Sequence, residues 1–464
     1  MKKYILPKKI KEEKNATDAN NLTVKQDLQI GLSESKTAAF KAGGYVILDF
    51  GKELRGGIRI LTFRAKNKPV RIRFGESLTE CCAELGGKQN ATNDHSLRDF
   101  TVHLQDYSDM TFGGTGFRFV RLDFYGEAII KSIVAENHIL RKNPIYVYRG
   151  KDKDIAKIFS TAKRTVDLCA AGDYLWDGIK RDRLVWIGDI HPEMLALTTL
   201  YGRMEIIERS LDFVKEQTPL PSWMNWYPMY SMWWIIIVAD YLSATNAEDF
   251  AKKQIEYLKG LVLLMLDFVS EDGEMCYPLN FVDWQTKDTP DEMHGVRAIN
   301  IIAVKKAIEI LNRCNESTQI AKKLLNRLLK KEIIVESSKS VLALKYFAVG
   351  LNDEEKKKLI TGGVNGFSTF MSYYILKAIA SFDKEKAVEM LKEYYGAMLK
   401  KGATSFWEDF DIRWAENSCR IDEIPKDGEK DIHGDFGAHC YIGFRHSLCH
   451  GWSAGIIKFI KEYC

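Results

Sequence analysis

Apolar and polar side chains alternate in short segments across residues 43–145, and glycines separate these segments. A period of two residues between glycine turns is typical of antiparallel strands with one solvent-facing side. The clearest segments are 46–50, 58–60, 70–74 and 117–122. The pattern therefore predicts a β-sandwich over 43–145, which supports a neighbouring domain or contacts carbohydrate.

The pattern changes in residues 146–464, where longer apolar segments at helical spacing alternate with loops of uneven length. The chain holds only 10 prolines, which suits a helix-rich region. So many helices joined in sequence favour an α/α toroid or an array of helical bundles. The expected helical segments are 191–215, 232–244, 254–269, 295–311, 318–329, 370–380, 384–399 and 451–463.

Residues 1–42 are polar and rich in lysine, which predicts an N-terminal arm that is mobile or lightly docked. The first residues resemble a signal peptide, but Pro7 and the lysines after it interrupt the apolar run. No segment reaches the ~18 apolar residues of a membrane helix. We therefore expect a cytoplasmic protein without a membrane partner.

Composition narrows the function further. Among 464 residues the formal net charge is only +4, which argues against a nucleic-acid partner bound through charge. The nine cysteines show no zinc-binding spacing, and no phosphate-binding loop or serine-hydrolase motif is present in the sequence. We expect no cofactor and no metal, and homodimer formation is left open.

All ten tryptophans lie between Trp176 and Trp452, and several stand beside acidic residues. Indole faces stack on sugar rings, while carboxylates accept protons from sugar hydroxyls. A single tryptophan is more often core material. The repeated pairing with acids nevertheless favours a carbohydrate partner. The pairs are Trp176–Asp177, Trp186–Asp189, Asp283–Trp284 and Trp407–Glu408.

The densest polar segment is 177–189, which carries three aspartates, one lysine and two arginines. It is either a solvated loop before a helix or a loop folded over something that covers its apolar residues. Trp186 and Ile187 favour the second interpretation, because both are costly to expose.

Two later segments also carry candidate chemistry. Glu408 has aromatic neighbours at Trp407 and Phe410, so its carboxylate is expected to be paired, catalytic or a helix cap. Four of the nine histidines lie within 433–450, near Asp431 and Asp435. Their spacing matches no metal motif, which favours histidines that hydrogen-bond around a polar pocket.

These segments resemble those of one known family. Residues 177–189 are similar to the signature loop of bacterial α-L-rhamnosidases of the six-hairpin glycosidase type. Residues 404–408 resemble the family's second catalytic segment, and 447–451 resemble its late Ser-Leu-Asn-His stretch. The glycine-rich strands at 75–78 and 116–120 are similar to its β-sandwich. The loop positions that match are Asp177, Arg181, Asp182, Arg183, Trp186, Gly188 and Asp189.

The resemblance implies a multidomain, mainly α fold, in which an (α/α)6 barrel at 146–464 follows the antiparallel β-sandwich. It also implies hydrolysis of α-L-rhamnosides with inversion, which uses one carboxylic acid and one carboxylate. The acid maps to Asp182 and the base to Glu408. The implied sugar-binding residues are Asp177, Arg181, Trp186, Asp189, Trp233, Trp284 and His450. Two further candidates, Asp283 and Trp407, come from the tryptophan–acid pairs.

One position departs from the family, which usually has glutamate where this chain has Asp182. The shorter side chain withdraws the proton donor by about one bond length, ~1.5 Å. Three interpretations follow. The loop is repositioned, or another group such as Asp177 or Asp189 is the donor, or the site has changed its sugar or lost activity.

The first hypothesis is therefore an inverting exo-glycosidase that removes terminal α-L-rhamnose or a similar sugar. The second is a non-catalytic carbohydrate-binding protein on the same scaffold. A third keeps hydrolysis but acts on an unsaturated uronyl residue, since one fold hosts several activities.

Overall fold

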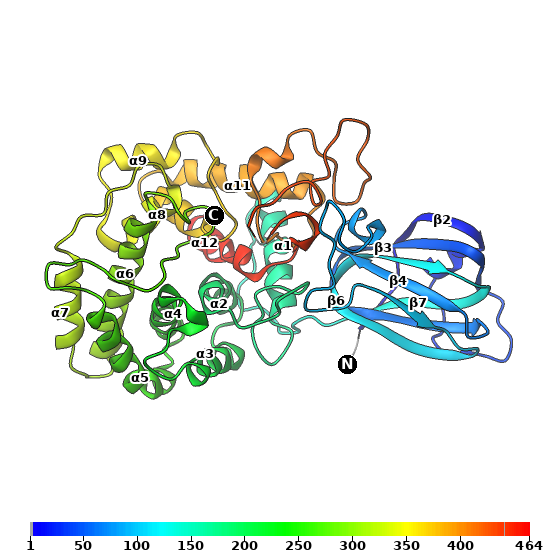
Figure 1. Ribbon diagram of the computed structural model, residues 1–464, viewed down its shortest axis with the longest axis horizontal. Helices are drawn as coiled ribbons and strands as arrows, with labels where there is room; N and C mark the ends of the chain where they lie inside the picture. The colour runs from blue at the N-terminus through cyan, green and yellow to red at the C-terminus, as the bar shows by residue number, and fades with distance from the viewer. Residues whose placement is uncertain (1–2, 440) are drawn as a thin grey trace.

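The computed structural model describes residues 3–439 and 441–464. It places an antiparallel sheet beside a helical region (Figure 1). The strands run in the order β1-β7-β3-β6-β4-β5, and β2 pairs with β3. The strands are β1 Lys3–Ile5, β2 Lys9–Thr17, β3 Ala38–Arg64, β4 Pro69–Gly75, β5 Asp99–His103, β6 Ser108–Phe124 and β7 Ala128–Asn137.

The predicted alternation is confirmed in β4. Val70, Ile72 and Phe74 are buried in the apolar core of the sheet. Arg71 and Arg73 point to the other face, where they form ion pairs with carboxylates of β5 and β6. Alternate residues of a strand face opposite sides of the sheet, so this sequence pattern specifies the register.

Two predicted segments, 46–50 and 58–60, belong to one long strand, β3. The strand is interrupted in its pairing with β6 at Gly56, where the register shifts. A Cβ atom at Gly56 would lie 2.3 Å from the carbonyl oxygen of Glu136, so only glycine permits this approach of β7. A second register shift lies between Asp49 and Leu54, and β3 continues through both shifts to Arg64.

Part of the predicted N-terminal arm is built into the sheet. β1 pairs with β7, and β2 pairs with β3. Met1 and Lys2 of the predicted arm lie outside the described residues. The domain boundaries drawn at 42 and 145 stay predictions, although the sheet receives strands from both sides of residue 42.

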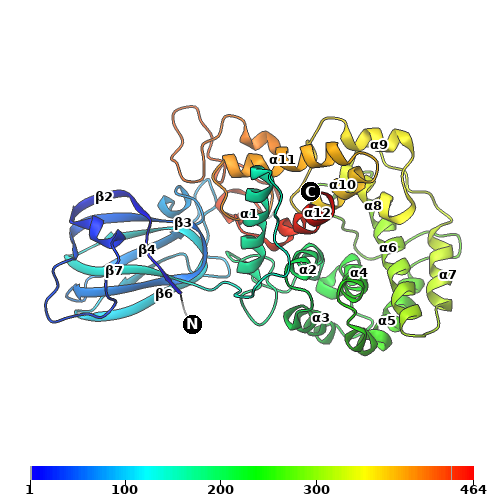
Figure 2. The ribbon, with the colours of Figure 1, turned by 180° about the vertical axis from the view of Figure 1, so that it is seen from behind.

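The helical region follows the sheet in the chain (Figure 2). Its longer helices are α1 Lys153–Cys169, α2 Ile187–Tyr201, α3 Glu205–Gln217, α4 Pro228–Thr245, α5 Glu248–Asp267, α6 Glu292–Arg313 and α11 Lys384–Lys400. The shorter ones are α7 Gln319–Leu328, α8 Lys339–Val349, α9 Asp353–Ile360, α10 Ser372–Ala380 and α12 Ile456–Tyr463.

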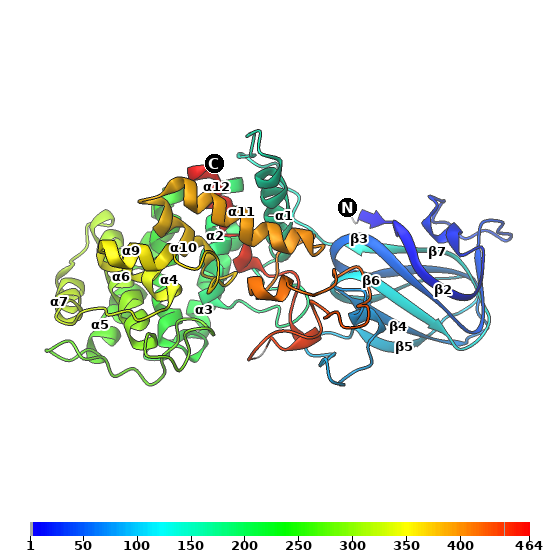
Figure 3. The ribbon, with the colours of Figure 1, turned by 90° about the horizontal axis from the view of Figure 1, so that it is seen from above.

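The even-numbered helices pack side by side in a closed sequence, α2–α4–α6–α8–α10–α12 and back to α2. The odd-numbered helices pack against members of this ring (Figure 1). Figure 3 shows the helical region and the sheet from above. Sequence composition explains the division. Every residue of α2 is buried, whereas α7 buries only Ala321, Leu324 and Leu328. A helix that is apolar on all sides belongs inside, and one with a single apolar face belongs outside.

The predicted helical segments all fall on observed helices, although 191–215 is divided by a break at Gly202. Prediction missed α1, α8 and α9. Helix α9, Asp353–Ile360, is too highly charged to show the apolar spacing that predicts a helix. Its start is marked by a capping box, in which Asn352 and Glu355 bond each other's backbone amides. Among the described helices, none is long and apolar enough to span a membrane.

Candidate active site

The three polar segments found in the sequence meet in space. The amide of Glu408 donates a hydrogen bond to the carbonyl of Ser447 (2.9 Å), and the amide of Gly451 donates to the carbonyl of Asp177 (2.7 Å). Gly178 and His450 form an isolated antiparallel bridge. Backbone pairing therefore fixes the 177–189 loop and the 404–411 segment on opposite sides of the 444–450 loop.

Arg181 lies at the centre of the polar groups. Its Nη1 atom is 2.9 Å from Oδ2 of Asp182, and its Nη2 atom donates to Oε1 of Glu408 at 2.6 Å. Its Nε atom donates to the carbonyl of Arg445. One planar guanidinium therefore orients both predicted catalytic carboxylates, and this fork geometry suits arginine better than lysine.

Asp182 lies at a turn in the left-handed region, with a φ of 52°, and Arg183 follows at 55°. Its side chain is 18% exposed, so it reaches solvent more than the neighbouring acids do. A second partner comes from the sheet region, since Nδ1 of His95 lies 3.3 Å from Oδ1 of Asp182. The predicted proton donor is thus held from both halves of the molecule.

Glu408 is almost completely buried, with an exposed fraction of 3%. Burial raises the pKa of Glu408, while the Arg181 guanidinium and a hydrogen bond from the Ser447 amide to Oε2 (3.0 Å) act in the opposite direction. The carboxylate is therefore kept more basic than an exposed glutamate, yet it retains partners that favour its charged form.

Asp177, Asp189 and His450 form a buried group beside Glu408. His450 Nε2 lies 3.7 Å from Asp177 Oδ2 and 3.9 Å from Asp189 Oδ2. Burial, reinforced by neighbouring carboxylates, raises the pKa of both aspartates well above the usual range. Burial also lowers the pKa of His450 well below its usual range. Neutral forms of these groups can both donate and accept hydrogen bonds with a neutral ligand.

Among the residues that the structure describes, two clusters have donor atoms close enough together to hold a metal ion. One is Asp177, Asp189 and His450, and the other is Glu76, Glu80 and His433. In the second, the Lys180 ammonium already lies 2.6 Å from Glu80, where a cation would sit. The expectation of a site without metal stays a prediction.

These groups open onto a cleft at the N-terminal ends of the inner helices. Its two connected cavities measure about 460 Å³ and about 120 Å³. Asp182, Asp177, Trp186 and His450 line the smaller cavity. Both cavities share a wall of Asp189, Glu408, Tyr230, Phe281, Trp284, Tyr441 and Trp452.

The predicted tryptophans divide into two groups. Trp186 and Trp284 line the cleft, and Trp284 stacks on His439 with ring centroids 5.1 Å apart. Trp233 and Trp407 are instead buried in the helical core, with exposed fractions of 2% and 0%. Their residue type could not separate these cases, since tryptophan serves cores and sugar sites alike.

Asp283 lines the larger cavity, where its Oδ1 atom accepts a hydrogen bond from the amide of Thr286. Sequence reasoning missed Asp409, although it follows Glu408 directly. Asp409 also lines the larger cavity, and burial raises its pKa to about 7. The missed aromatic residues are Tyr230, Phe281, Tyr441 and Trp452. Only Phe281 has an acidic residue close by in the sequence, Asp283.

The fold of this chain, a helical ring beside an antiparallel sheet, is similar to that of solved rhamnosidase structures. No family model and no curated protein sequence matches the chain.

A rhamnosidase from Klebsiella oxytoca with rhamnose bound superposes with a TM-score of 0.77 at 18% identity, over 100% of this chain and 96% of that one. The GH78 family rhamnosidase of Bacillus sp. GL1 gives 0.72 at 17% identity, over 96% of this chain and 48% of that one. An α-L-rhamnosidase from Dictyoglumus thermophilum gives 0.68 at 14%, over 99% and 51%. The chain therefore spans nearly all of the first structure and about half of the other two.

Proposed function

We propose that this protein is an inverting exo-glycoside hydrolase that removes terminal α-L-rhamnose, or a similar sugar, from oligosaccharides or glycosides. The observation that carries the proposal is the Arg181 guanidinium, which contacts Asp182 and Glu408 in a cleft lined by aromatic rings. The likeness to rhamnosidase structures supports the same class of substrate.

The scaffold we propose for this site is the (α/α)6 barrel. The closed order of contacts among the even-numbered helices supports it, as does the outer position of amphipathic helices such as α7. The loops that line the cleft precede or begin the inner helices, which leaves one end of the ring open to substrate.

In the proposed mechanism Asp182 protonates the glycosidic oxygen, and Glu408 removes a proton from the attacking water. Inversion requires a water between the base and the sugar, with the two carboxyl groups about 6.5–9.5 Å apart. Each carboxylate binds a different terminal nitrogen of Arg181, so the guanidinium separates them. The raised pKa of Glu408 makes it a stronger base than an exposed carboxylate.

Asp189 is a second candidate for the proton donor. It lines both cavities, and burial together with the charges of Glu408 and Asp182 keeps its pKa well above the usual range. A carboxyl whose pKa is raised keeps its proton to higher pH, which suits a proton donor. Its competing role is to hold a sugar hydroxyl, as the sequence predicts.

The lining of the cleft favours a neutral 6-deoxy sugar over an unsaturated uronyl residue. A uronate needs a cation for its carboxylate. Lys180 is fully buried among other partners, and Arg181 is engaged by two carboxylates. Arg413, which lines the larger cavity, forms an ion pair with Asp411. Phe281, Trp284 and Trp452 instead supply an apolar wall that suits a C6 methyl group.

We expect the purified protein to release the aryl group from an aryl α-L-rhamnoside and to leave α-L-fucoside, β-D-galactoside and β-D-glucuronide much less affected. Proton NMR of the first product should show β-L-rhamnose, because inversion changes the anomeric configuration. Calorimetry with L-rhamnose distinguishes the alternative, since binding without any turnover would make the protein a carbohydrate-binding module.

The acidic limb of the pH–rate profile should lie above the ordinary glutamate value of 4.5, because Glu408 must be ionised to act as base and burial raises its pKa. Arg181→Gln removes a charge that lowers this pKa, so the limb should move to higher pH as turnover falls. Arg183→Gln is the matched control, since Arg183 donates to the carbonyls of Gly114 and His95 rather than to Glu408. A limb that stays in place in Arg181→Gln would contradict the assignment of Glu408.

A further inference from the structure

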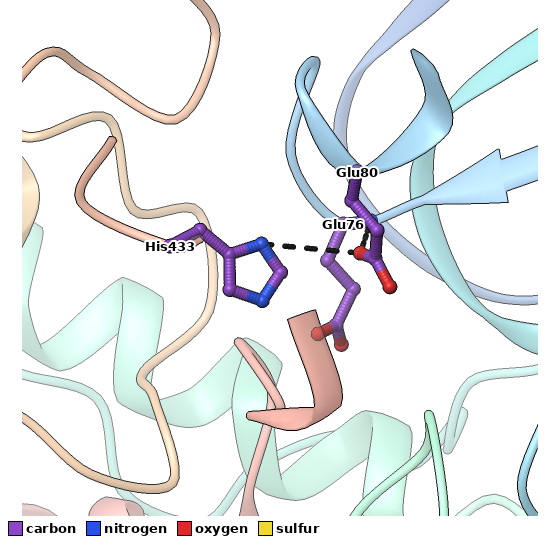
Figure 4. A group of neighbouring side chains, drawn as sticks. All are labelled: Glu76, Glu80 and His433. Carbon is purple, nitrogen blue, oxygen red and sulfur yellow. Dashed lines mark hydrogen bonds and ion pairs between the residues drawn. The ribbon is translucent and has the colours of Figure 1, made fainter. Parts of the chain in front are cut away.

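A buried polar cluster lies behind Glu408, where the sheet meets the helical region. Figure 4 shows the carboxylate of Glu80 facing His433 of the helical region, with Glu76 beside it; both glutamates follow β4 in the chain. The three side chains are buried, with exposed fractions of 0%, 5% and 0%. Burying polar and charged side chains costs free energy unless each has a hydrogen-bond or ion-pair partner, so these side chains need partners.

Lys180 supplies the positive charge of this cluster. Its ammonium lies 2.6 Å from Glu80 Oε1 and 3.5 Å from Glu76 Oε2. It also donates to the carbonyls of Phe444 and His446. Lys180 directly precedes Arg181, so the cluster anchors the loop that presents the guanidinium.

Glu76 extends the cluster toward the active site. Its Oε2 atom accepts a hydrogen bond from the amide of Leu448 (2.6 Å), and its Oε1 atom accepts one from Ser447 Oγ (3.3 Å). The amide of Ser447 in turn donates to Oε2 of Glu408. A side chain of the sheet region thus lies two hydrogen bonds from the proposed base.

We propose that Glu76 is a positioning residue: it holds the Ser447–Leu448 backbone so that the Ser447 amide fixes the orientation of Glu408. This inference rests on the proposed function where it concerns turnover. Its structural part, the order of the 444–450 loop, stands independently of any activity.

The two contacts of Glu76 favour a side chain with two acceptor oxygens at this position. A glutamine offers only one acceptor oxygen, so its NH2 group would either face the Leu448 amide, which is also a donor, or require the Ser447 hydroxyl to turn and accept. The groups that surround Glu76 also set its charge. Burial raises the pKa of Glu76 to about 7 and the charge of Glu80 acts in the same direction, whereas Lys180, the Leu448 amide and Arg98 lower it.

Glu76→Gln should lower kcat about tenfold or more with little change in KM, because a small displacement of a catalytic group costs rate rather than substrate binding. Glu136→Gln is the matched control. Glu136 is a buried glutamate of the same sheet, in β7, and it accepts a hydrogen bond from Thr111. Equal kcat values in the two variants would overturn the proposal.

Amide hydrogen exchange measured by mass spectrometry tests the structural part, whether or not the protein turns over rhamnosides. Glu76→Gln should speed exchange in peptides that cover 444–450, and Glu136→Gln should not. If the wild-type protein hydrolyses none of the glycosides but the exchange difference is present, the proposed function fails and the anchoring role stands. Unchanged exchange in Glu76→Gln refutes the anchoring role.

Discussion

Glu408→Gln should reduce the turnover of an aryl α-L-rhamnoside by about 10²–10⁴-fold, which is the usual contribution of a general base. The amide keeps the size of the side chain but cannot accept a proton from water. Calorimetric binding of L-rhamnose should remain measurable, because the aromatic wall of the cleft is unchanged. Initial rates and titration calorimetry on the same preparation give both results.

Glu389→Gln is the control for this change. Glu389 lies in α11, is exposed, and forms an ion pair with Lys386 on the surface of that helix. It should leave turnover as in the wild-type protein. If Glu408→Gln hydrolyses the rhamnoside at the wild-type rate, Glu408 is not the base and the proposed mechanism is wrong.

The second large effect is expected at Asp182. Asp182→Asn should reduce turnover by about 10²–10³-fold when the leaving group is a poor one, because the amide cannot supply the proton. The loss should be far smaller for a dinitrophenyl rhamnoside, whose leaving group departs without protonation. The dependence of kcat on the acidity of the released phenol measures this difference.

Asp189→Asn distinguishes the two candidate donors. If Asp189 supplies the proton, its variant, and not Asp182→Asn, will show the strong dependence on leaving group. Asp182→Glu adds a further comparison, since it extends the side chain by one methylene toward the length that the family usually has. If the loss of rate in both asparagine variants does not depend on the leaving group, then neither Asp182 nor Asp189 is the proton donor.

Sequence reasoning located the parts of the site that lie close together in the chain. Residues 177–189 carry Asp177, Asp182 and Asp189 within one loop, and the structure brings all three to the smaller cavity. Glu408 was recognisable from its aromatic neighbours. In these segments local composition was enough to single out the candidates, although contacts from other segments, such as His95 with Asp182, complete their positioning.

The contributions of the sheet could not be predicted in the same way. Ser77 contacts His433 across 356 positions of the chain, and Glu76 contacts Leu448 across 372. No periodicity or motif relates residues so far apart, since only the packing of the two regions brings them together. Helix α9 was missed for a different reason. Its sequence shows no apolar spacing, and only the capping box at Asn352 and Glu355 indicates that a helix begins there.

The loop after β4 carries a consequence for how such proteins can be recombined. Glu76 and His95 both come from the sheet, yet they contact the loops that present Glu408 and Asp182. A chimaera that joins this helical region to the sheet of a relative would need to inherit residues 75–98 together with the helices. The unit that can be exchanged as a working module is therefore the pair of regions, although the chain passes from one to the other only once.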